Sequence, residues 1–344
     1  MKIDEIILNA ERNVRLTAWI QAVDGEYGKI HKRPAMVILP GGGYSMCSDR
    51  EAEPVAFAYV KAGYQVFILR YSVGAHKTWP NPLNDYEQAM ELIISKAEEW
   101  HVLTDKIAVI GFSAGGHLAA CAATLAEHRP GAAILGYAAL KKEISDMCQP
   151  GMPYPVETVD GKTCPCFLFA ARDDNMVTID NTVDFQKALT ENGISFESHI
   201  YAYGQHGFST GEENLNAAKL CSRTPNWVRD SVEWLGDVFG VLTPNGMDQP
   251  AKEIKINGDH DPQLSVDCTI GYLRSQGAQA QAVLAEVFAK LDAVMAAFNT
   301  TGTGLPSTAF KSFRLWELLA VLQMPEDEIK KLDAALREIP GSCA

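Results

Sequence analysis

The sequence predicts an α/β fold in which a doubly wound, mostly parallel sheet is followed by a small all-α module. From residue 35 to about residue 240, short apolar runs alternate with segments of helical spacing, which is typical of parallel strands joined by crossover helices. The apolar runs are hydrophobic almost throughout, as expected for strands that are covered on both faces. Beyond residue 264 the pattern is helical only.

Six apolar runs are predicted to be strands, and they cover residues 35–40, 65–72, 106–112, 131–138, 166–171 and 197–203. Four segments between them have the spacing of helices, and they cover residues 53–63, 82–100, 115–128 and 182–193. The first and last of these helices end at Gly63 and Gly193, because glycine adopts the conformation that closes a helix without steric strain.

The chain is predicted to have three parts. Residues 1–242 form the α/β domain, residues 243–263 a linker that contains proline and glycine, and residues 264–344 a helical module. Within the module, helical patterns at 271–298, 313–322 and 325–339 surround an inner loop at 300–307. We assign the module no chemistry. Its apolar helix faces must pack against one another, against the α/β domain or against a second subunit. An oligomer formed through this tail is therefore one of the possible arrangements.

The charge and hydropathy of the chain exclude several classes of partner. The formal net charge is -13, and no cluster of Lys and Arg interleaved with aromatic residues offsets it, so nucleic acid is not an expected partner. No stretch approaches about 18 consecutive apolar residues, so no membrane segment is predicted. The acids in residues 1–14 are unlike a signal peptide. We therefore expect a cytoplasmic protein.

The eight cysteines are scattered through a chain too long to need disulfide staples, so free thiols are expected. Cys164 and Cys166 are separated by a single residue and lack the two-residue spacer of common zinc and redox motifs. Neither a metal nor another cofactor is predicted.

The segment GFSAGGHLAA (111–120) marks the point where a predicted strand turns into a helix. A nucleophilic serine at such a point stands on a sharp, strained turn, and the residues two positions away on either side must be small. Gly111 and Gly115 meet this need around Ser113. The five-residue pattern alone arises by chance in about one such chain in ten to twenty, but the strand before it and the helix after it supply the context that the motif requires.

A second glycine cluster, PGGGY (40–44), ends the predicted strand 35–40. Backbone without side chains can direct N–H groups at the oxygen that becomes anionic when an ester carbonyl is attacked. The expected donors are the N–H groups of Gly42, Gly43 and Ala114. A flexible loop and a phosphate-binding turn are the alternatives, although the loop has no Lys and lacks the full G-x-G-x-x-G spacing.

A nucleophilic serine needs a base, and His206 in YGQHGF (203–208) is the candidate among eight histidines. It follows the last predicted strand in a glycine-flanked loop, from which the imidazole reaches the carboxyl edge of the sheet. His117, four residues after the serine, is expected to pack or to hydrogen-bond nearby. An acid must orient the imidazole, and either Asp173 or Asp174 is suitably placed after the preceding strand.

With these motifs the chain resembles the α/β-hydrolase superfamily, and within it the carbohydrate-esterase-like branch that contains acetyl-xylan and feruloyl esterase relatives. The resemblance covers roughly residues 15–240 and is carried by LPGGGYSMCSDREAEPVA, NPLNDYEQA, IAVIGFSAGGHLAA, DDNMV and YGQHGF. Pro40 stands where the hormone-sensitive-lipase type has the histidine of HGGG, which favours this branch. The tail loosely resembles C-terminal helical modules of some bacterial carbohydrate-active hydrolases.

The resemblance implies that Ser113 is the nucleophile, His206 the base and Asp174 the acid, with oxyanion donors from Gly42, Gly43 and Ala114. Asp174 is chosen over its neighbour because the family's acid precedes a valine by three residues, as Asp174 precedes Val177. Ala171 and Arg172 replace the His-Gly pair that is typical before the acid. This departure alters the neighbourhood of the acid loop and leaves the triad positions intact.

The expected function is a serine esterase that hydrolyses short acyl esters, acetyl first, of small-molecule or oligosaccharide alcohols through an acyl-enzyme. A feruloyl esterase and an amide or peptide hydrolase would use the same triad, and a non-catalytic binding protein on this fold is the alternative from another class. A short acyl group is favoured because only about ten residues separate the strand 131–138 from a proline-rich stretch, too few for an apolar lid. Tyr44 and Trp79 are expected to line a small acyl pocket or stack on a sugar ring, with a core position as the alternative.

Overall fold

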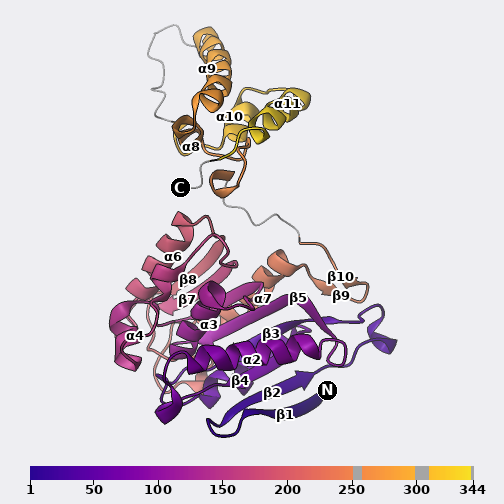
Figure 1. Ribbon diagram of the computed structural model, residues 1–344, viewed down its shortest axis with the longest axis vertical. Helices are drawn as coiled ribbons and strands as arrows, with labels where there is room; N and C mark the ends of the chain where they lie inside the picture. Colours follow the sequence, from indigo (N-terminus) through magenta and orange to yellow (C-terminus); the bar gives the residue numbers. More distant parts are fainter. Residues whose placement is uncertain (251–257, 299–309, 342–344) are drawn as a thin grey trace. The chain divides into compact units, whose positions relative to one another are not determined.

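The computed structural model describes residues 1–250, 258–298 and 310–341. The chain folds as two compact units, residues 1–254 and residues 255–344 (Figure 1). The first unit contains the sheet and all the residues that the sequence singled out for chemistry.

The sheet of the first unit has eight strands in the order β1-β2-β4-β3-β5-β6-β7-β8. The strands are β1 (Lys2–Asn9), β2 (Val14–Ile20), β3 (Arg33–Leu39), β4 (Gln65–Arg70), β5 (Val102–Phe112), β6 (Ala132–Gly136), β7 (Cys166–Ala171) and β8 (Phe196–Tyr201). All pairings among β3 to β8 are parallel, whereas β1 and β2 add an antiparallel edge. The predicted fold class, a mostly parallel α/β sheet followed by helices, is confirmed.

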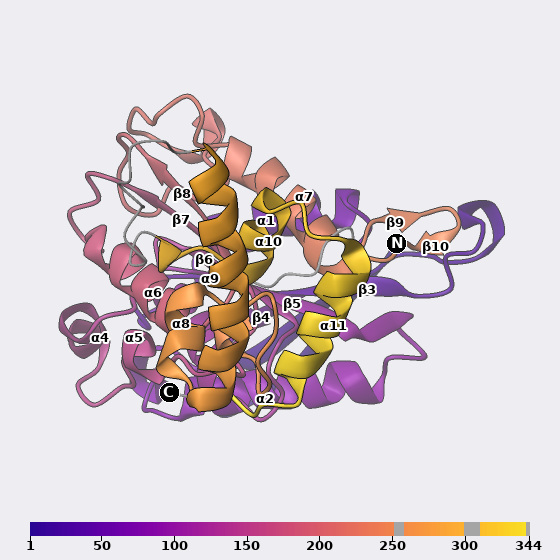
Figure 2. The ribbon, with the colours of Figure 1, turned by 90° about the horizontal axis from the view of Figure 1, so that it is seen from above.

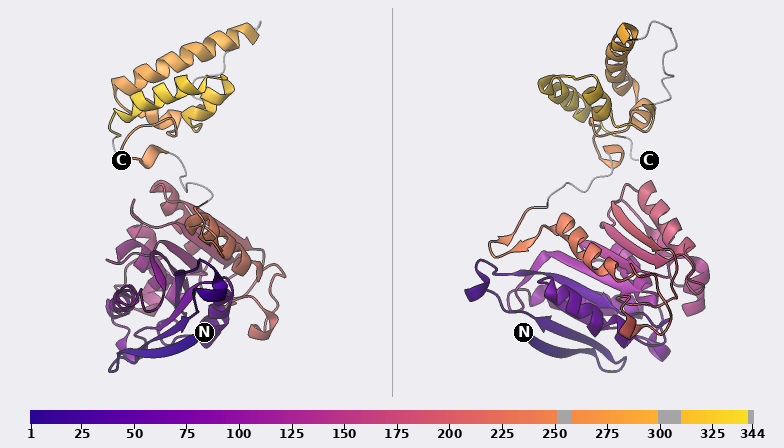
Figure 3. Two further views of the ribbon diagram at one scale, coloured as in Figure 1. Left: turned by 90° about the vertical axis from the view of Figure 1, so that its right-hand side faces the viewer. Right: turned by 180° about the vertical axis from the view of Figure 1, so that it is seen from behind.

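Helices cover both faces of this sheet. One face carries α2 (Asn81–Ser95), α3 (Ala114–Leu125) and α6 (Asp180–Glu191), with α2 and α3 in front of the strands in Figure 1. The other face carries α1 (Glu53–Lys61) and α7 (Asn226–Phe239), and α7 is the orange helix seen from behind in Figure 3. Two short helices, α4 (Lys142–Cys148) and α5 (Pro155–Thr158), lie between β6 and β7 in the chain. The central strands are therefore buried on both sides, as their continuous apolar runs require.

Several elements of the first unit lie outside the sequence prediction, among them the β1–β2 hairpin and helix α7. The hairpin of β1 and β2 was not predicted because β1 is an edge strand with largely exposed or half-buried residues, so it has no continuous apolar run. Helix α7 was not predicted either, although its large apolar residues Trp227, Trp234 and Leu235 pack against the sheet.

The predicted linker at 243–263 begins with structure. Strands β9 (Leu242–Thr243) and β10 (Gly246–Met247) form a small hairpin, and the N–H of Lys29 donates to the carbonyl of Pro244 at 2.8 Å. Residues 251–257 of the predicted linker lie outside the described residues. The start of the predicted linker is thus tied to the first unit, and the division between the two units, at residues 254 and 255, lies inside the predicted linker.

The second unit is helical throughout its described residues. Its helices are α8 (Ile270–Ser275), α9 (Ala278–Phe298), α10 (Leu315–Val321) and α11 (Glu326–Arg337), and α9 lies beside α11 (Figure 2). The pattern that predicted one helix over 271–298 is interrupted at Gln276 and Gly277. An isolated antiparallel bridge pairs Thr269 with Arg314 and so joins the starts of the two helix pairs. The predicted inner loop at 300–307 lies outside the described residues.

Candidate functional site

Ser113 stands on a strained turn between β5 and α3. Its φ is 52°, a left-handed value that non-glycine residues rarely adopt. The N–H of Ser113 donates to the carbonyl of Gly136 at 3.0 Å, and its own carbonyl accepts from the N–H groups of His117 and Ala139 at 2.9 and 3.1 Å. These bonds hold the strained residue in place at the carboxyl edge of the sheet.

The two glycines around Ser113 are required by close backbone contacts. A Cβ atom on Gly111 would lie 2.1 Å from the carbonyl oxygen of Gly115, and one on Gly115 would lie 2.1 Å from the carbonyl oxygen of Leu39. Backbone atoms cannot move aside as the end of a flexible side chain can. The turn that raises Ser113 above the sheet therefore exists only with glycine at both positions.

The structure brings Ser113, His206 and Asp174 together in one hydrogen-bonded chain. The Ser113 Oγ lies 2.8 Å from His206 Nε2, and His206 Nδ1 lies 2.7 Å from Asp174 Oδ2. The Asp174 side chain is fully buried and that of His206 is 14% exposed. With the proton on Nδ1 directed at the carboxylate, Nε2 is left to accept the hydroxyl proton of the serine.

The acid loop separates the roles of two adjacent aspartates. Asp174 Oδ1 accepts from the N–H groups of Met176 and Val177 at 2.9 and 3.0 Å, so its other oxygen faces His206. Asp173 Oδ1 instead accepts from the N–H of Gly204 at 2.7 Å and ties the acid loop to the loop that carries His206. Arg172, which departs from the family pattern, keeps its backbone bonded to Tyr201 on β8.

The glycine loop after β3 is shaped by positive φ angles at Gly42 (130°) and Gly43 (61°). The carbonyl of Gly42 accepts from Ser45 and Met46, and a Cβ on Gly42 would lie 2.2 Å from the carbonyl oxygen of Met46. Among the described residues, no acceptor takes the N–H of Gly42, Gly43 or Ala114. The three N–H groups that the sequence named are thus available to a ligand.

Tyr44 and Trp79 differ in what they offer a substrate. Tyr44 is fully buried, and its hydroxyl donates to His117 Nδ1 at 2.8 Å while His117 Nε2 donates to the carbonyl of Pro153 at 2.9 Å. The expected contact between the Tyr44 ring and a substrate is therefore wrong, because the ring lies in the core. Trp79 is half-buried and meets the edge of the His117 ring at a centroid distance of 6.0 Å.

Sequence reasoning missed Glu51 and Tyr137, two buried polar residues behind the site, because no motif marks either of them. The Glu51 carboxylate accepts from the N–H of Gly41 at 2.8 Å and from the hydroxyl of Tyr137 at 2.6 Å. Glu51 and Glu53 are both glutamates in the same segment, but Glu51 is buried, whereas Glu53 is part-exposed and pairs with Arg70. Only the tertiary structure distinguishes the two.

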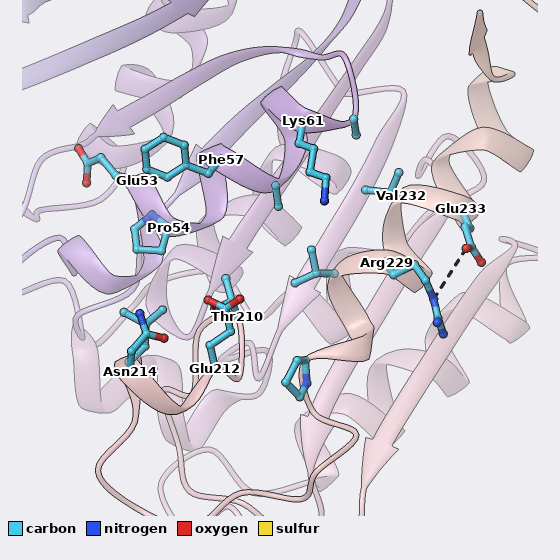
Figure 4. Close-up of a pocket in the computed structure, with 15 residues that line it drawn as sticks. Glu53, Pro54, Phe57, Lys61, Thr210, Glu212, Asn214, Arg229, Val232 and Glu233 are labelled. Atoms are coloured by element: carbon cyan, nitrogen blue, oxygen red, sulfur yellow. Dashed lines mark hydrogen bonds and ion pairs between the residues drawn. The ribbon is translucent and has the colours of Figure 1, made fainter.

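A groove of about 850 Å³ lies between α1, α7 and residues 210–215, and none of the three residues of the hydrogen-bonded chain lines it (Figure 4). It is lined by apolar side chains that include Phe57 and Val232 and by charged ones that include Lys61, Arg229 and Glu233. Arg50 donates to the carbonyl of Leu215 at 2.9 Å beside this groove. The groove therefore contributes no group to the chemistry of Ser113.

Within the described residues, no group of three or more His, Cys, Asp or Glu side chains is placed to hold a metal ion. Cys164 and Cys166 are both free and buried. In the same part of the chain, no helix is long and apolar enough to cross a membrane.

Comparisons with known proteins identify the family of the chain. The chain is 39% identical to MGS-M1, an α/β-hydrolase enzyme from a Medee basin deep-sea metagenome library, with a TM-score of 0.64 over 69% of this chain and 98% of that one. The chain belongs to the α/β-hydrolase family. The family model BD-FAE matches residues 26–149. The expected carbohydrate-esterase-like branch of the family is confirmed.

Two further relatives belong to the same branch. The acetyl ester-xyloside bifunctional hydrolase of Caldicellulosiruptor lactoaceticus is 25% identical, with a TM-score of 0.61 over 69% of this chain and 97% of that one. The acetylxylan esterase of Xylanibacter ruminicola is 28% identical over 57% of this chain and 45% of its own length. The chain spans less than half the length of the first curated relatives that it matches.

Proposed function

We propose that this α/β hydrolase is a serine carboxylic ester hydrolase that removes short acyl groups, acetyl above all, from carbohydrate esters. The observation that carries the proposal is the unbroken chain from Ser113 Oγ through His206 to the buried carboxylate of Asp174, raised on a strained turn beside unpaired N–H groups. A hydroxyl, a base, an orienting acid and adjacent donors are the parts that acyl transfer needs.

The reaction follows from these positions. Ser113 Oγ attacks the acyl carbonyl carbon while its proton passes to His206 Nε2, and Asp174 stabilises the imidazolium that forms. The N–H groups of Gly42, Gly43 and Ala114 donate to the oxygen that becomes negative. The imidazolium then gives its proton to the departing alcohol oxygen as the ester C–O bond breaks. Water, deprotonated by His206, attacks the acyl-enzyme and releases the acid and the free serine.

Two observations favour an acetyl ester of a sugar. Two relatives are named for acetyl esters, an acetylxylan esterase and an acetyl ester-xyloside bifunctional hydrolase, and a third is named an endo-1,4-beta-xylanase. The helices between β6 and β7, α4 and α5, have only seven and four residues, which supports our inference that no large apolar lid covers the acyl group. Trp79, the half-buried aromatic residue next to His117, is the side chain that we propose contacts the acyl group or the sugar ring.

The alternatives are a feruloyl esterase, an amide or peptide hydrolase, and a binding protein without turnover. A panel of acetylated sugars, nitrophenyl acetate, a feruloyl ester and a peptide amide separates the first two, because each reading predicts a different substrate with the highest kcat/KM. The variant Ser113→Ala tests the mechanism itself. We expect it to fold as the wild type does and to lose ester turnover by on the order of 10³-fold or more. A wild-type protein without turnover on any ester would favour the binding protein.

A further inference from the structure

Glu51 is a buried carboxylate that the reaction described above does not use. It ends the short turn η2 (Asp49–Glu51) directly before α1 and is 3% exposed. One carboxylate oxygen accepts from the N–H of Gly41, the residue before the two expected oxyanion glycines, and the other accepts from the hydroxyl of Tyr137. Glu51 therefore binds the backbone of the glycine loop directly.

The same network reaches the loop that carries His206. The N–H of Ser209, three residues after His206, donates to the hydroxyl oxygen of Tyr137 at 3.0 Å, and the Ser209 hydroxyl donates to the carbonyl of Arg50. The Tyr137 ring also meets the edge of the His206 ring at a centroid distance of 5.1 Å. Through Tyr137, one carboxylate thus joins the oxyanion loop to the base.

Burying a carboxylate at this position costs free energy, because the charged group is removed from water. Burial removes it from water and raises the pKa of Glu51, which the hydrogen bonds from Tyr137 and Gly41 partly oppose. Asp85, another fully buried carboxylate, has Arg12 at 2.5 Å as a cationic partner. Among the described residues, no Lys or Arg forms an ion pair with Glu51, so nothing repays its desolvation in that way.

The close packing around Gly41 explains why this anchor matters to the reaction. A Cβ on Gly41 would lie 2.7 Å from Glu51 Oε2 and 3.1 Å from the Cβ of Ser113. The carboxylate and the nucleophile therefore both lie close to Gly41 and leave no room for a side chain there. A shift of Glu51 moves the start of the glycine loop relative to Ser113, and a displacement of about 1 Å is enough to cost about 10²-fold in rate.

We propose that Glu51 is a positioning residue of the ester-hydrolysis site, which fixes the Gly41–Gly43 turn directly and the His206 loop through Tyr137. This inference rests on the proposed esterase function. Glu51 touches neither the substrate nor the reacting atoms, so it acts through the geometry of the donors and the base. Its loss should reduce stabilisation of the transition state and leave binding of the ground-state ester almost unchanged.

The test uses Glu51→Gln and Tyr137→Phe in the full chain, with Glu87→Gln as the matched control. Glutamine keeps the size of the side chain but offers one acceptor oxygen to two donors, and phenylalanine removes only the bridging hydroxyl. Glu87 also accepts backbone N–H groups, those of Glu127 and His128, but it does so past the far end of α3 from Ser113. The same chemical change is thus made at a carboxylate close to the glycine loop and at one remote from it, which also contacts the His128 ring at 2.8 Å.

We expect kcat for nitrophenyl acetate to fall about 10- to 100-fold in Glu51→Gln and Tyr137→Phe, below the roughly 10²–10³-fold cost of removing an oxyanion donor outright. KM should change little, and Glu87→Gln should keep the wild-type kcat. Folded variants of Glu51 and Tyr137 with wild-type kcat would overturn the inference. If one of the two fails to fold, the other decides.

A second readout is independent of turnover. Backbone amide exchange of residues 41–46 and 205–210 should quicken in both variants and stay unchanged in Glu87→Gln. Unchanged exchange in both segments would overturn the positioning role even if no ester were hydrolysed. A wild-type protein that hydrolyses no ester while these segments lose protection in the variants would instead refute the proposed function and keep the structural link.

Discussion

Replacement of Asp174 by Asn should inactivate the enzyme, whereas the same replacement at Asp173 should not. The Asp174 carboxylate accepts three hydrogen bonds, two from backbone N–H groups at one oxygen and one from His206 Nδ1 at the other. Asparagine has a single oxygen. If that oxygen stays with the two backbone donors, the amide NH₂ faces Nδ1, and the imidazole must carry its proton on Nε2.

In that tautomer the imidazole cannot accept the Ser113 proton. The loss of kcat expected for this wrong tautomer is about 10⁴-fold, equivalent to about 5 kcal/mol of transition-state stabilisation. Asp173 differs because its side chain accepts the N–H of Gly204, which an asparagine oxygen also does. Asp173→Asn should therefore keep most of the wild-type kcat.

The assay is the steady-state hydrolysis of nitrophenyl acetate by both variants, each first shown to unfold at a temperature close to that of the wild type. Equal effects of the two substitutions would refute the assignment of the acid. A larger loss of kcat in Asp173→Asn would reverse it. Both outcomes can be interpreted directly, because the two residues are adjacent and receive the same chemical change.

Three further predictions follow from the close contacts, the buried histidine and the acyl site. Gly115→Ala should sharply reduce stability and abolish turnover, because the new Cβ would lie 2.1 and 2.4 Å from two backbone oxygens. In the control Gly161→Ala the new Cβ meets nothing within 4 Å, so this variant should melt as the wild type does. Equal melting temperatures of the two variants would contradict the contact argument. Burial lowers the pKa of His117 from 6.5 to about 4. Between these pH values the unfolded chain binds more protons than the folded chain does. The contribution of neutral His117 to the free energy of unfolding is therefore fully present above about pH 6.5 and decreases by about 3 kcal/mol as the pH falls towards 4. Denaturant titrations of His117→Gln, which offers Tyr44 an acceptor and Pro153 a donor, should show a smaller fall, and an unchanged fall would contradict the assignment. For esters of one alcohol, kcat/KM should be highest for acetyl and decrease through butyryl to octanoyl, because we infer a short acyl site that does not bury a long chain, worth about 0.8 kcal/mol per methylene. A maximum at octanoyl would contradict the short acyl site, and one at feruloyl would support the feruloyl alternative.

The sequence was sufficient for the parts of the site that depend on local pattern. A strand, a turn with obligatory glycines and a helix are encoded within residues 106–125, so the position of Ser113 could be predicted without tertiary contacts. The order of the parallel strands places loop residues at one edge, which explains why His206 was found. Choosing Asp174 over Asp173 required the family resemblance, because the two residues are identical and adjacent, and the hydrogen bond with His206 that distinguishes Asp174 forms only in the folded chain.

The parts that were missed depend on contacts between distant segments. Tyr44 follows the glycine loop, yet its ring turns into the core to meet His117, a partner 73 residues away. Glu51 and Tyr137 are 86 residues apart, and their hydrogen bond forms only when the fold brings the segments after β3 and β6 together. The β1–β2 hairpin escaped detection because an edge strand with a mostly exposed or half-buried surface lacks the apolar run that identifies central strands.

The measurement that tests the central claim most directly is covalent labelling by a fluorophosphonate probe, followed by mass spectrometry of the labelled peptide. The probe reacts with a serine only when a base activates its hydroxyl. We expect one label per chain, on Ser113, in the wild type and in the control Ser95→Ala, whose hydroxyl bonds only to the carbonyl of Leu92 on the surface of α2. Ser113→Ala should take no label, and His206→Ala should take it far more slowly. Labelling of another serine, or a wild type that takes no label, would contradict the account.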